Sequence, residues 1–270
     1  MNGTNYISLS SPVFDINMSE YKTQGIFHTS RIRQDKAIEE QMRLGYQGRE
    51  LYEMIQNADD EKSPEVEISL QGSSLHISNW GDNPFTEVGI VSILRSFLSP
   101  KKYGKKGKGK PIGCKGLGFR SLLNWGSDIY IKSNGVCCHF SEQIAKERWE
   151  ALKKGFDQTD IISFEAENTC PIPLLSVCER YEDGGVTKVD AQDDTMDRCT
   201  TDISIIVRDA DVKKDIETKI KTLPSTVLLF LKSVRKITLK TESYLRVISC
   251  ESSNRIMEHY TIVSIKETVR

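Results

Sequence analysis

Two side chains in the segment 49–60 have the types and the spacing that phosphate chemistry requires. Glu53 and Asn57 are four residues apart in a stretch of helical periodicity, so both face one side of a helix, one turn apart. The amide oxygen of Asn57 is a hard ligand of the kind that Mg²⁺ accepts. The carboxylate of Glu53 could orient or deprotonate a water molecule beside a phosphate. Asp60 lies one turn beyond Asn57, and an ordinary solvated helix face is the competing interpretation.

A glycine-rich segment provides the second candidate element. Gly113, Gly116 and Gly118 let the backbone approach a phosphate closely, and Lys115 adds a positive charge. The apolar stretch 117–125 predicts a helix whose first N–H groups would face the anion. The segment is not a P-loop, because no Gly-Lys-Ser/Thr ends it, and it does not follow a strand as a dinucleotide fingerprint would. A flexible loop is the alternative.

The elements that must position these residues mix helical and strand patterns. We expect two helices within 31–60, separated by a turn at Gly45 and Gly48, and further helices at 86–97, 117–125 and after 207. We expect strands at 66–70, 74–78, 128–132, 136–140, 201–207, 234–239, 244–248 and 260–265, the first four forming two hairpins. This mixture predicts an α/β two-layer sandwich: a mixed, mostly antiparallel sheet with helices on one face.

The domain organisation follows from the same patterns. Residues 1–30 are expected to form an N-terminal arm, and residues 31–240 one domain that carries both candidate elements. Residues 241–270 read as additional strands that could begin a following region. The acidic segment 181–198 reads as a surface loop.

The composition excludes several classes of protein. Of the 270 residues, 38% are hydrophobic and 28% are charged, which is typical of a folded domain rather than a disordered or membrane chain. The absence of a long apolar run and of a signal-peptide pattern predicts no membrane association and a cytoplasmic location. The net charge of −1 argues against nucleic-acid binding over the whole surface. The 7 cysteines show neither a CxxC pair nor zinc-ligand spacing, so we expect free thiols.

A lysine-rich segment has a separate interpretation. Seven lysines fall between Lys101 and Lys115, among several glycines. A solvated, mobile lid explains them most simply. One or two could contact phosphate, or the run could form a local nucleic-acid patch. Tyr103 is the one aromatic residue among them, so a stacking platform for single strands is poorly supported.

The motifs together resemble the GHKL ATPase superfamily, which includes gyrase, heat-shock chaperone ATPases, MutL and histidine kinases. The resemblance covers about residues 31–239 and implies a Bergerat-type ATP-binding fold. The amino-acid sequences of segments 49–60 and 115–121 most resemble those of sacsin-like N-terminal ATP-binding modules. The matching motifs, in chain order, are Glu53-x-x-x-Asn57-Ala58-Asp59-Asp60, Asn79-x-Gly81, Gly113-x-x-Gly116-x-Gly118 and Thr201 at the start of a strand.

The resemblance implies a role for each matching residue. Glu53 would be the general base of ATP hydrolysis, and Asn57 the Mg²⁺ ligand. Residues 84–112 would be a lid that closes over the nucleotide. The other cofactor-binding residues would be Asp60 on the helix, Asn79 and Gly81 at the adenine, Gly113, Lys115, Gly116, Leu117, Gly118 and Phe119 around the phosphates, and Thr201, whose hydroxyl would support the adenine end.

Three positions depart from the family pattern. Asn79 stands where an Asp usually reads adenine; its oxygen can accept from the adenine amino group, and its NH₂ can face a ring nitrogen. Asn83 stands where the second glycine of that motif is usual, and Thr200 stands where a glycine usually precedes Thr201. The phosphate end therefore follows the family pattern more closely than the base end.

The functional expectation is an ATP- and Mg²⁺-binding, slowly hydrolysing module. By resemblance, nucleotide binding would drive lid closure and homodimerisation, with the arm crossing between protomers. One alternative is a nucleotide-gated protein- or nucleic-acid-binding module without turnover, the nucleic acid being bound through Lys101–Lys115. Another is a chaperone-like scaffold. A histidine kinase is disfavoured, because the surroundings of His28 lack the acidic residues and proline of a phosphoacceptor box.

Overall fold

A single open sheet runs through the part of the chain that the computed structural model describes, namely residues 17–18, 21, 27–85, 87–95, 118–133, 136–167, 170–181, 199–257 and 260–270. The sheet has nine strands in the order β5-β4-β3-β6-β2-β1-β7-β8-β9. Every neighbouring pair is antiparallel except β1 and β7, which are parallel. The strands are β1 (Glu65–Gln71), β2 (Ser74–Asn79), β3 (Asp128–Ser133), β4 (Val136–Phe140), β5 (Glu179–Arg180), β6 (Thr201–Ile206), β7 (Lys236–Thr241), β8 (Tyr244–Met257) and β9 (Tyr260–Val269).

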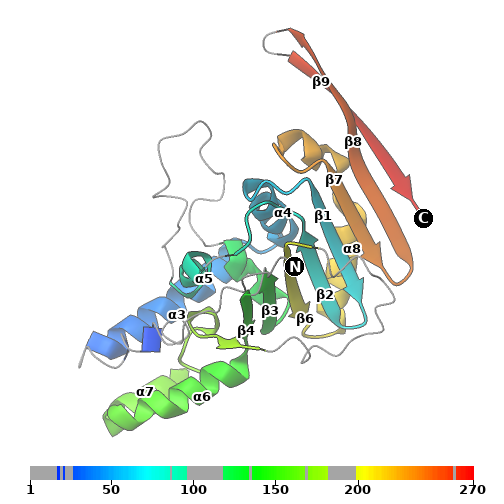
Figure 1. Cartoon of the computed structure of the whole chain (residues 1–270). Helices are drawn as coiled ribbons and strands as arrows, with labels where there is room; N and C mark the ends of the chain where they lie inside the picture. The colour runs from blue at the N-terminus through cyan, green and yellow to red at the C-terminus, as the bar shows by residue number, and fades with distance from the viewer. Residues whose placement is uncertain are drawn as a thin grey trace, which may run out of the picture.

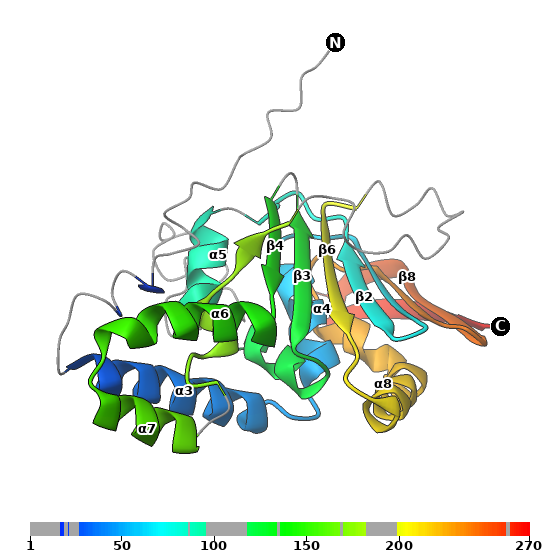
Figure 2. The same cartoon turned by 90° about the horizontal axis from the view of Figure 1, so that it is seen from below.

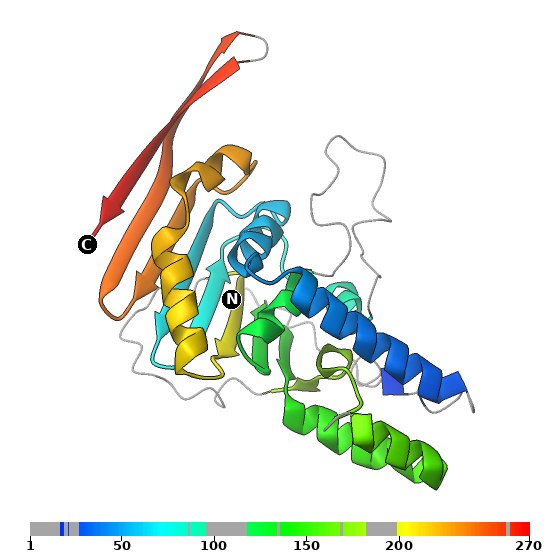
Figure 3. The same ribbon diagram turned by 180° about the vertical axis from the view of Figure 1, so that it is seen from behind.

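The prediction of an α/β protein with a mixed, mostly antiparallel sheet is confirmed. In Figures 1 and 3, α4 and α8 lie across one face of the sheet. Figure 2 shows α3, α6 and α7 together beside the β4 end of the sheet. The α-helices are α3 (Phe27–Gly45), α4 (Glu50–Asp60), α5 (Glu87–Leu94), α6 (Glu142–Leu152), α7 (Gln158–Glu167) and α8 (Ala210–Thr222). Short 3-10 helices are η2 (Gly118–Asn124), η3 (Lys153–Gly155), η4 (Leu174–Ser176) and η6 (Ser225–Phe230).

Most expected elements occur where the sequence predicts them, with two differences among the helices. The two helices of residues 31–60 are α3 and α4, and both predicted hairpins form. Within the expected helix 117–125, residues Gly118–Asn124 form the 3-10 helix η2. Helices α6 and α7 correspond to no predicted element. Thr86, at which the expected helix 86–97 begins, and residues 182–198 of the expected acidic loop 181–198 lie outside the described residues.

The main core fills the space between the sheet and the helices on its face. Alternation along β1 and β2 turns Ile68 and Ile77, which are opposite each other, toward this core. From the helix side, Met54 and Ile55 of α4 and Ile216 of α8 pack into the same cluster. Each side chain of this size stabilises the fold by about 1.5–3 kcal/mol when fully buried, so the core holds α4 firmly on the sheet.

A second core joins α3, α6 and α7 and includes residues from the expected N-terminal arm. Met18 and Tyr21 are buried in it together with Trp149 of α6 and Phe164 of α7. Asn17 is also buried, and its Nδ2 donates to the carbonyls of Leu94 (3.0 Å) and Ser176 (2.8 Å). The described part of the arm therefore packs against its own chain, and α3 already begins within the range 1–30. None of the described helices is both long and apolar enough to cross a membrane.

Candidate functional site

Helix α4 carries the first two candidate residues on one face. Gly48 adopts φ +84° in the turn before the helix, a conformation that glycine reaches without strain. Leu51, Met54 and Ile55 bury the opposite side of the helix in the main core. The side chain of Glu53 is 12% exposed. Asn57, one turn later, is half-buried, and its side chain forms no hydrogen bond with another described residue.

The carboxylate of Glu53 lies directly against Gly118. A Cβ atom added to Gly118 would lie 2.3 Å from Oε2 of Glu53 and 3.2 Å from its Cβ. No side chain fits at such a distance, so glycine is required at position 118 for this approach. The structure therefore brings together the helical motif and the end of the glycine-rich segment, which are far apart in the sequence.

Burial determines the electrostatics of Glu53. It raises the pKa of this carboxyl above its ordinary value, and the opposing effect comes from Arg49, whose Nη2 lies 3.5 Å from Oε1. Arg49 is mostly exposed, with 62% of its side chain accessible, so water screens its charge. A carboxylate with a raised pKa is a stronger base than an ordinary glutamate, which suits proton abstraction.

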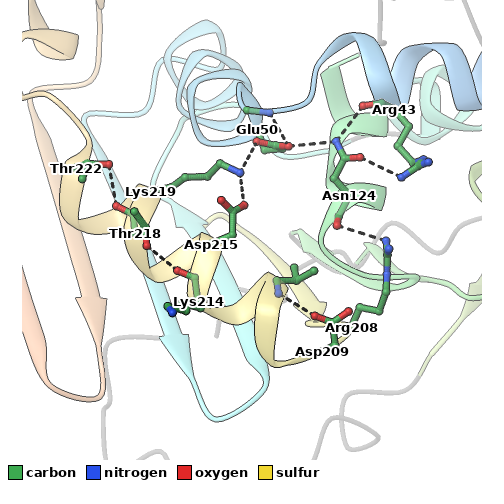
Figure 4. A network of polar contacts seen from close by, with 12 residues as sticks. Arg43, Glu50, Asn124, Arg208, Asp209, Lys214, Asp215, Thr218, Lys219 and Thr222 are labelled. Carbon is green, nitrogen blue, oxygen red and sulfur yellow. Dashed lines mark hydrogen bonds and ion pairs between the residues drawn. The ribbon is translucent and has the colours of Figure 1, made fainter.

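A second glutamate of α4, Glu50, is the centre of a buried polar network (Figure 4). Its side chain is fully buried. Oε1 accepts from the N–H of Gly48 (3.0 Å) and from Nδ2 of Asn124 (3.1 Å). Lys219 of α8 places Nζ 3.6 Å from Oε2 and is also paired with Asp215. This carboxylate therefore links α4 to η2 and α8, as a buried charge must be partnered to be tolerated.

The same network fixes the far end of η2. Nδ2 of Asn124 also donates to the carbonyl of Arg43 (2.9 Å), while Nη2 of Arg208 donates to the carbonyl of Leu123 (2.7 Å). Since Gly118 begins η2 and Asn124 ends it, contacts with α4 hold both ends of this 3-10 helix. Sequence reasoning missed Glu50, Asn124 and Lys219, because only the fold brings them together.

The two aspartates at the end of α4 have different surroundings. The carboxylate of Asp59 is buried and accepts from the backbone N–H groups of Lys232, Ser233 and Val234 at 2.6–3.1 Å. Asp59 thus holds the connection before β7 and is a structural residue. Asp60, the predicted cofactor-binding residue, is half-buried in the last turn of the helix.

The other candidate residues gather where three strands end. Asn79 of β2 is opposite Thr201 of β6, and Thr201 is opposite Ser133 of β3. Oγ of Ser133 and Oγ1 of Thr201 are 2.7 Å apart. Ser133 also accepts from the N–H of Phe85 (2.8 Å). Sequence reasoning missed Ser133, although the period-two alternation of β3 places it on the core face with Ile129 and Ile131.

The loop after β2 connects this strand end to α4. The N–H of Gly81 donates to Oδ1 of Asn79 at 3.2 Å. A Cβ on Gly81 would lie 2.7 Å from the carbonyl oxygen of Glu61, just after α4. The N–H of Trp80 donates to Oγ of Ser63 (2.9 Å). The strand-end group and the Glu53–Asn57 group are therefore attached to the same helix.

The described residues include only part of the predicted site. Gly113, Lys115, Gly116 and Leu117 lie outside them, as do the other lysines of the 101–115 segment. The side chain of Phe119 is buried in the main core, with its ring centroid 6.5 Å from that of Phe140. Only the backbone of Phe119 is thus available to a ligand. The hydroxyl of Thr201 is buried and engaged with Ser133.

The described arrangement can serve two kinds of chemistry. At the helix end, the half-buried carboxylate of Glu53 lies one turn from the amide of Asn57, which has no hydrogen bond to another described residue, and Gly118 permits close approach. At the strand end, an amide and two hydroxyls offer neutral hydrogen-bonding groups. Among the described residues no cluster of three or more His, Cys, Asp or Glu side chains could hold a metal ion. No protein-family model matches the chain, and no curated protein matches its sequence.

Proposed function

We propose that this chain binds Mg²⁺–ATP in a Bergerat-type fold and hydrolyses it slowly, as the GHKL ATPases do. The observation that carries the proposal is the contact between Glu53 and Gly118. It unites a general-base candidate with the last glycine of a phosphate-binding motif. A solvated helix face and an unrelated flexible loop, the two competing interpretations, give no reason for this contact.

Glu53 is the residue that removes a proton from the attacking water. Its raised pKa, due to burial, brings its basicity closer to the working pH. Because Gly118 has no side chain, the backbone at the end of the glycine-rich segment lies directly against this carboxylate. Asn57 fits a Mg²⁺ ligand, because its half-buried amide is not used by another described residue. Mg²⁺ keeps several waters and takes phosphate oxygens, so a single protein ligand is compatible with it. When bound, Mg²⁺ neutralises charge on the phosphates.

The proposed conformational switch involves the segment between α5 and η2. Nη2 of Arg120, in η2, donates to the carbonyl of Ile93 near the end of α5 (2.9 Å), so both ends of this segment are held together. Asn17 binds the next carbonyl, that of Leu94, and ties the N-terminal segment to the same place. A closing lid over residues 84–112 would thus have a fixed base, and its closure would accompany homodimerisation, as in the family that the motifs resemble.

Replacing the proposed base tests the function directly. We expect Glu53→Gln to bind ATP but to release phosphate about 10²–10⁴ times more slowly than the unchanged protein. Binding is measured by calorimetry with Mg²⁺–ATP, and turnover by phosphate release. Glu142→Gln, at a glutamate that is 61% exposed on α6, is the matched control and should leave both unchanged. Normal turnover by Glu53→Gln would disprove the assignment of the base.

A nucleotide-gated binding module without turnover is the second candidate. The ion pair between Glu53 and Arg49 favours it, since this pair engages the carboxylate that would otherwise face water. Tight ATP binding by the unchanged chain, with no phosphate release at any protein concentration, would select this candidate. Measuring over a range of protein concentrations also reveals any dependence of turnover on dimerisation.

A further inference from the structure

One outer edge of the sheet is formed by β9, which is 10 residues long and pairs with β8 on one side. Among the described residues no further strand follows it, and Figure 1 shows β9 along the outer side of β8. The strand at the opposite edge, β5, has 2 residues. A long strand at an open edge presents a row of N–H and C=O groups to which another extended chain can pair. β9 is therefore the edge that can accept a partner strand.

The hydrogen bonds to β8 show which backbone groups of β9 face outward. Leu245 and Arg270 exchange both of their backbone bonds, at 3.0 and 2.8 Å. Because such pairs alternate with non-bonded pairs in an antiparallel ladder, the N–H and C=O groups of Ile265, Glu267 and Val269 point away from β8. At both register irregularities the extra residue belongs to β8, and β9 continues without one. The alternation therefore extends to the start of β9.

The charges of β9 are confined to one half of the strand. Residues 260–264 carry no charge, whereas Lys266, Glu267 and Arg270 do, and Ile265 separates the two halves. If two copies of the strand pair antiparallel about Ile265, the entire strand is matched and every charged residue is opposite a neutral one. Like charges placed directly opposite each other would be destabilising. β9 is thus complementary to an antiparallel copy of itself.

The neighbouring registers are less favourable. Hydrogen bonds form where outward-facing residues of the two copies are opposite each other. Registers centred on Lys266 or on Glu267 satisfy this condition, but each places a charge opposite its own copy. A register centred on Ser264 avoids that repulsion and leaves Val269 without a partner in the other strand. Charge and length together therefore select the register about Ile265.

Exposed apolar side chains lie beside the same edge. The 3-10 helix η6 packs against β8 and β9, and its residues Leu229 and Phe230 are 50% and 75% exposed. Val269, on β9 itself, is 54% exposed. Large apolar side chains that gather on a surface indicate an association site. An open edge with apolar side chains next to it favours a protein partner there.

We infer that β9 is a homodimer interface, at which two copies of the chain pair their β9 strands antiparallel about Ile265 and join their sheets. Such an interface is isologous, with the two-fold axis at Ile265. Lys266 then lies opposite the partner's Ser264, and Glu267 lies opposite the partner's Val263. The interface forms without nucleotide, so the inference does not rest on the proposed ATP chemistry.

The test measures the dissociation constant of the dimer by sedimentation equilibrium, over a range of protein concentrations and without nucleotide. Ser264 is exposed, so replacing it leaves the core unchanged. Ser264→Lys places a lysine opposite the partner's Lys266 at two symmetric positions and should weaken the dimer about tenfold. Ser264→Glu places a carboxylate opposite the same lysine and should strengthen the dimer by a similar factor.

Matched variants separate this pairing from a general effect of charge. Thr268 is also exposed and lies opposite the neutral Ile262 of the second copy in the inferred register. Thr268→Lys and Thr268→Glu should therefore leave the dissociation constant nearly unchanged. Combining Ser264→Lys with Lys266→Glu restores opposite charges across the interface, so the dimer should recover. Circular dichroism establishes that each variant is folded.

The possible outcomes are distinct. A chain that stays monomeric at every concentration would overturn the inference, whether the edge then serves another protein or none. A dimer that forms only with Mg²⁺–ATP, or one that responds alike to Ser264→Lys and Ser264→Glu, would also overturn it. Neither result bears on ATP turnover, which phosphate release measures separately. Dimerisation without nucleotide, shifted in opposite directions by the two Ser264 variants, supports the inference.

Discussion

The helix end and the strand end of the candidate site use opposite kinds of chemistry. At the helix end, the half-buried Glu53 and the buried Glu50 are carboxylates with cationic neighbours, Arg49 and Lys219. At the strand end, Asn79, Thr201 and Ser133 are neutral: Asn79 accepts from the N–H of Gly81, and the hydroxyls of Thr201 and Ser133 bind each other. Both ends are attached to α4, one along its length and the other through the loop that packs after its last turn.

This difference separates two tasks within one site. Charged groups in a partly buried setting respond to the charge of a ligand and to pH. Neutral donors and acceptors respond to the pattern of hydrogen-bonding groups on a ligand, and a mismatch there leaves a buried group unpaired. Under the proposed function, the helix end would serve the phosphates and proton transfer, and the strand end would recognise the base. Four predictions test this separation, in order of decreasing effect.

The largest effect on phosphate release is expected from adding one methyl group to Gly118 at the helix end. In Gly118→Ala the new Cβ would lie 2.3 Å from Oε2 of Glu53 and displace the carboxylate. We expect phosphate release to fall about a hundredfold, the usual cost of a catalytic group misplaced by an ångström. Gly155→Ala is the control, because its new Cβ would meet no atom within 4 Å. It should leave phosphate release unchanged. Unchanged turnover in Gly118→Ala would show that Glu53 does not act from this position.

The next effect concerns the buried charge of Glu50. Lys219→Met removes the cation 3.6 Å from Oε2 and leaves the carboxylate without its charged partner. We expect the free energy of unfolding, measured with urea, to fall by about 2–3 kcal/mol. The double variant Glu50→Gln with Lys219→Met should recover much of the loss, because no buried charge then remains. If the double variant is as unstable as the single one, the charge pair is not the cause.

A smaller loss of stability is expected from a neutral group at the strand end. Ser133→Ala leaves the N–H of Phe85 and the hydroxyl of Thr201 without this partner. We expect the free energy of unfolding to fall by about 1–2 kcal/mol, as for other buried neutral hydrogen bonds. Ser73→Ala, at an exposed turn residue, is the control. A loss as large as that of Lys219→Met would remove the distinction between the two ends.

The smallest effect is a shift in pH dependence. Burial raises the pKa of Glu53 and Arg49 opposes this, so Arg49→Gln should raise the pKa further. Since the base must be ionised, the acid limb of the pH–rate profile should move to higher pH, and the shift should be small because Arg49 is exposed and water screens its charge. Lys146→Gln, which breaks a comparable exposed pair with Glu142, should leave the profile in place.

The same shift has a consequence for stability. The folded state favours protonated Glu53, so the stability that this group contributes is present below the ordinary pKa of glutamate. It is lost as the pH rises through the raised pKa of the folded state. Arg49→Gln should extend this window upward. Urea unfolding at several pH values between those limits measures the sign, and a shift toward lower pH would contradict the assignment.

Local sequence patterns predicted the elements whose side chains alternate or repeat with the period of a strand or a helix. The β1–β2 hairpin follows from alternating side chains on either side of Gly72, which adopts φ +58° in the turn. The placement of Glu53 and Asn57 on one face follows from helical geometry alone. Helices α6 and α7 were not predicted, because they pack in the second core, whose residues come from distant parts of the chain. The 3-10 geometry of η2 likewise coincides with tertiary contacts at both its ends.

By itself, the sequence therefore determined which residues can do chemistry and which local elements carry them. The tertiary structure alone decided that Gly118 lies against Glu53 and that Lys219 forms an ion pair with Glu50. It also decided that Ser133 forms a hydrogen bond with Thr201, which lies opposite Asn79 at the strand ends. The physical reason is the range of the interactions. Helical and strand periodicity depend on neighbours within a few residues, whereas close approach, charge pairing and cross-strand register depend on how a nine-stranded sheet and its helices pack.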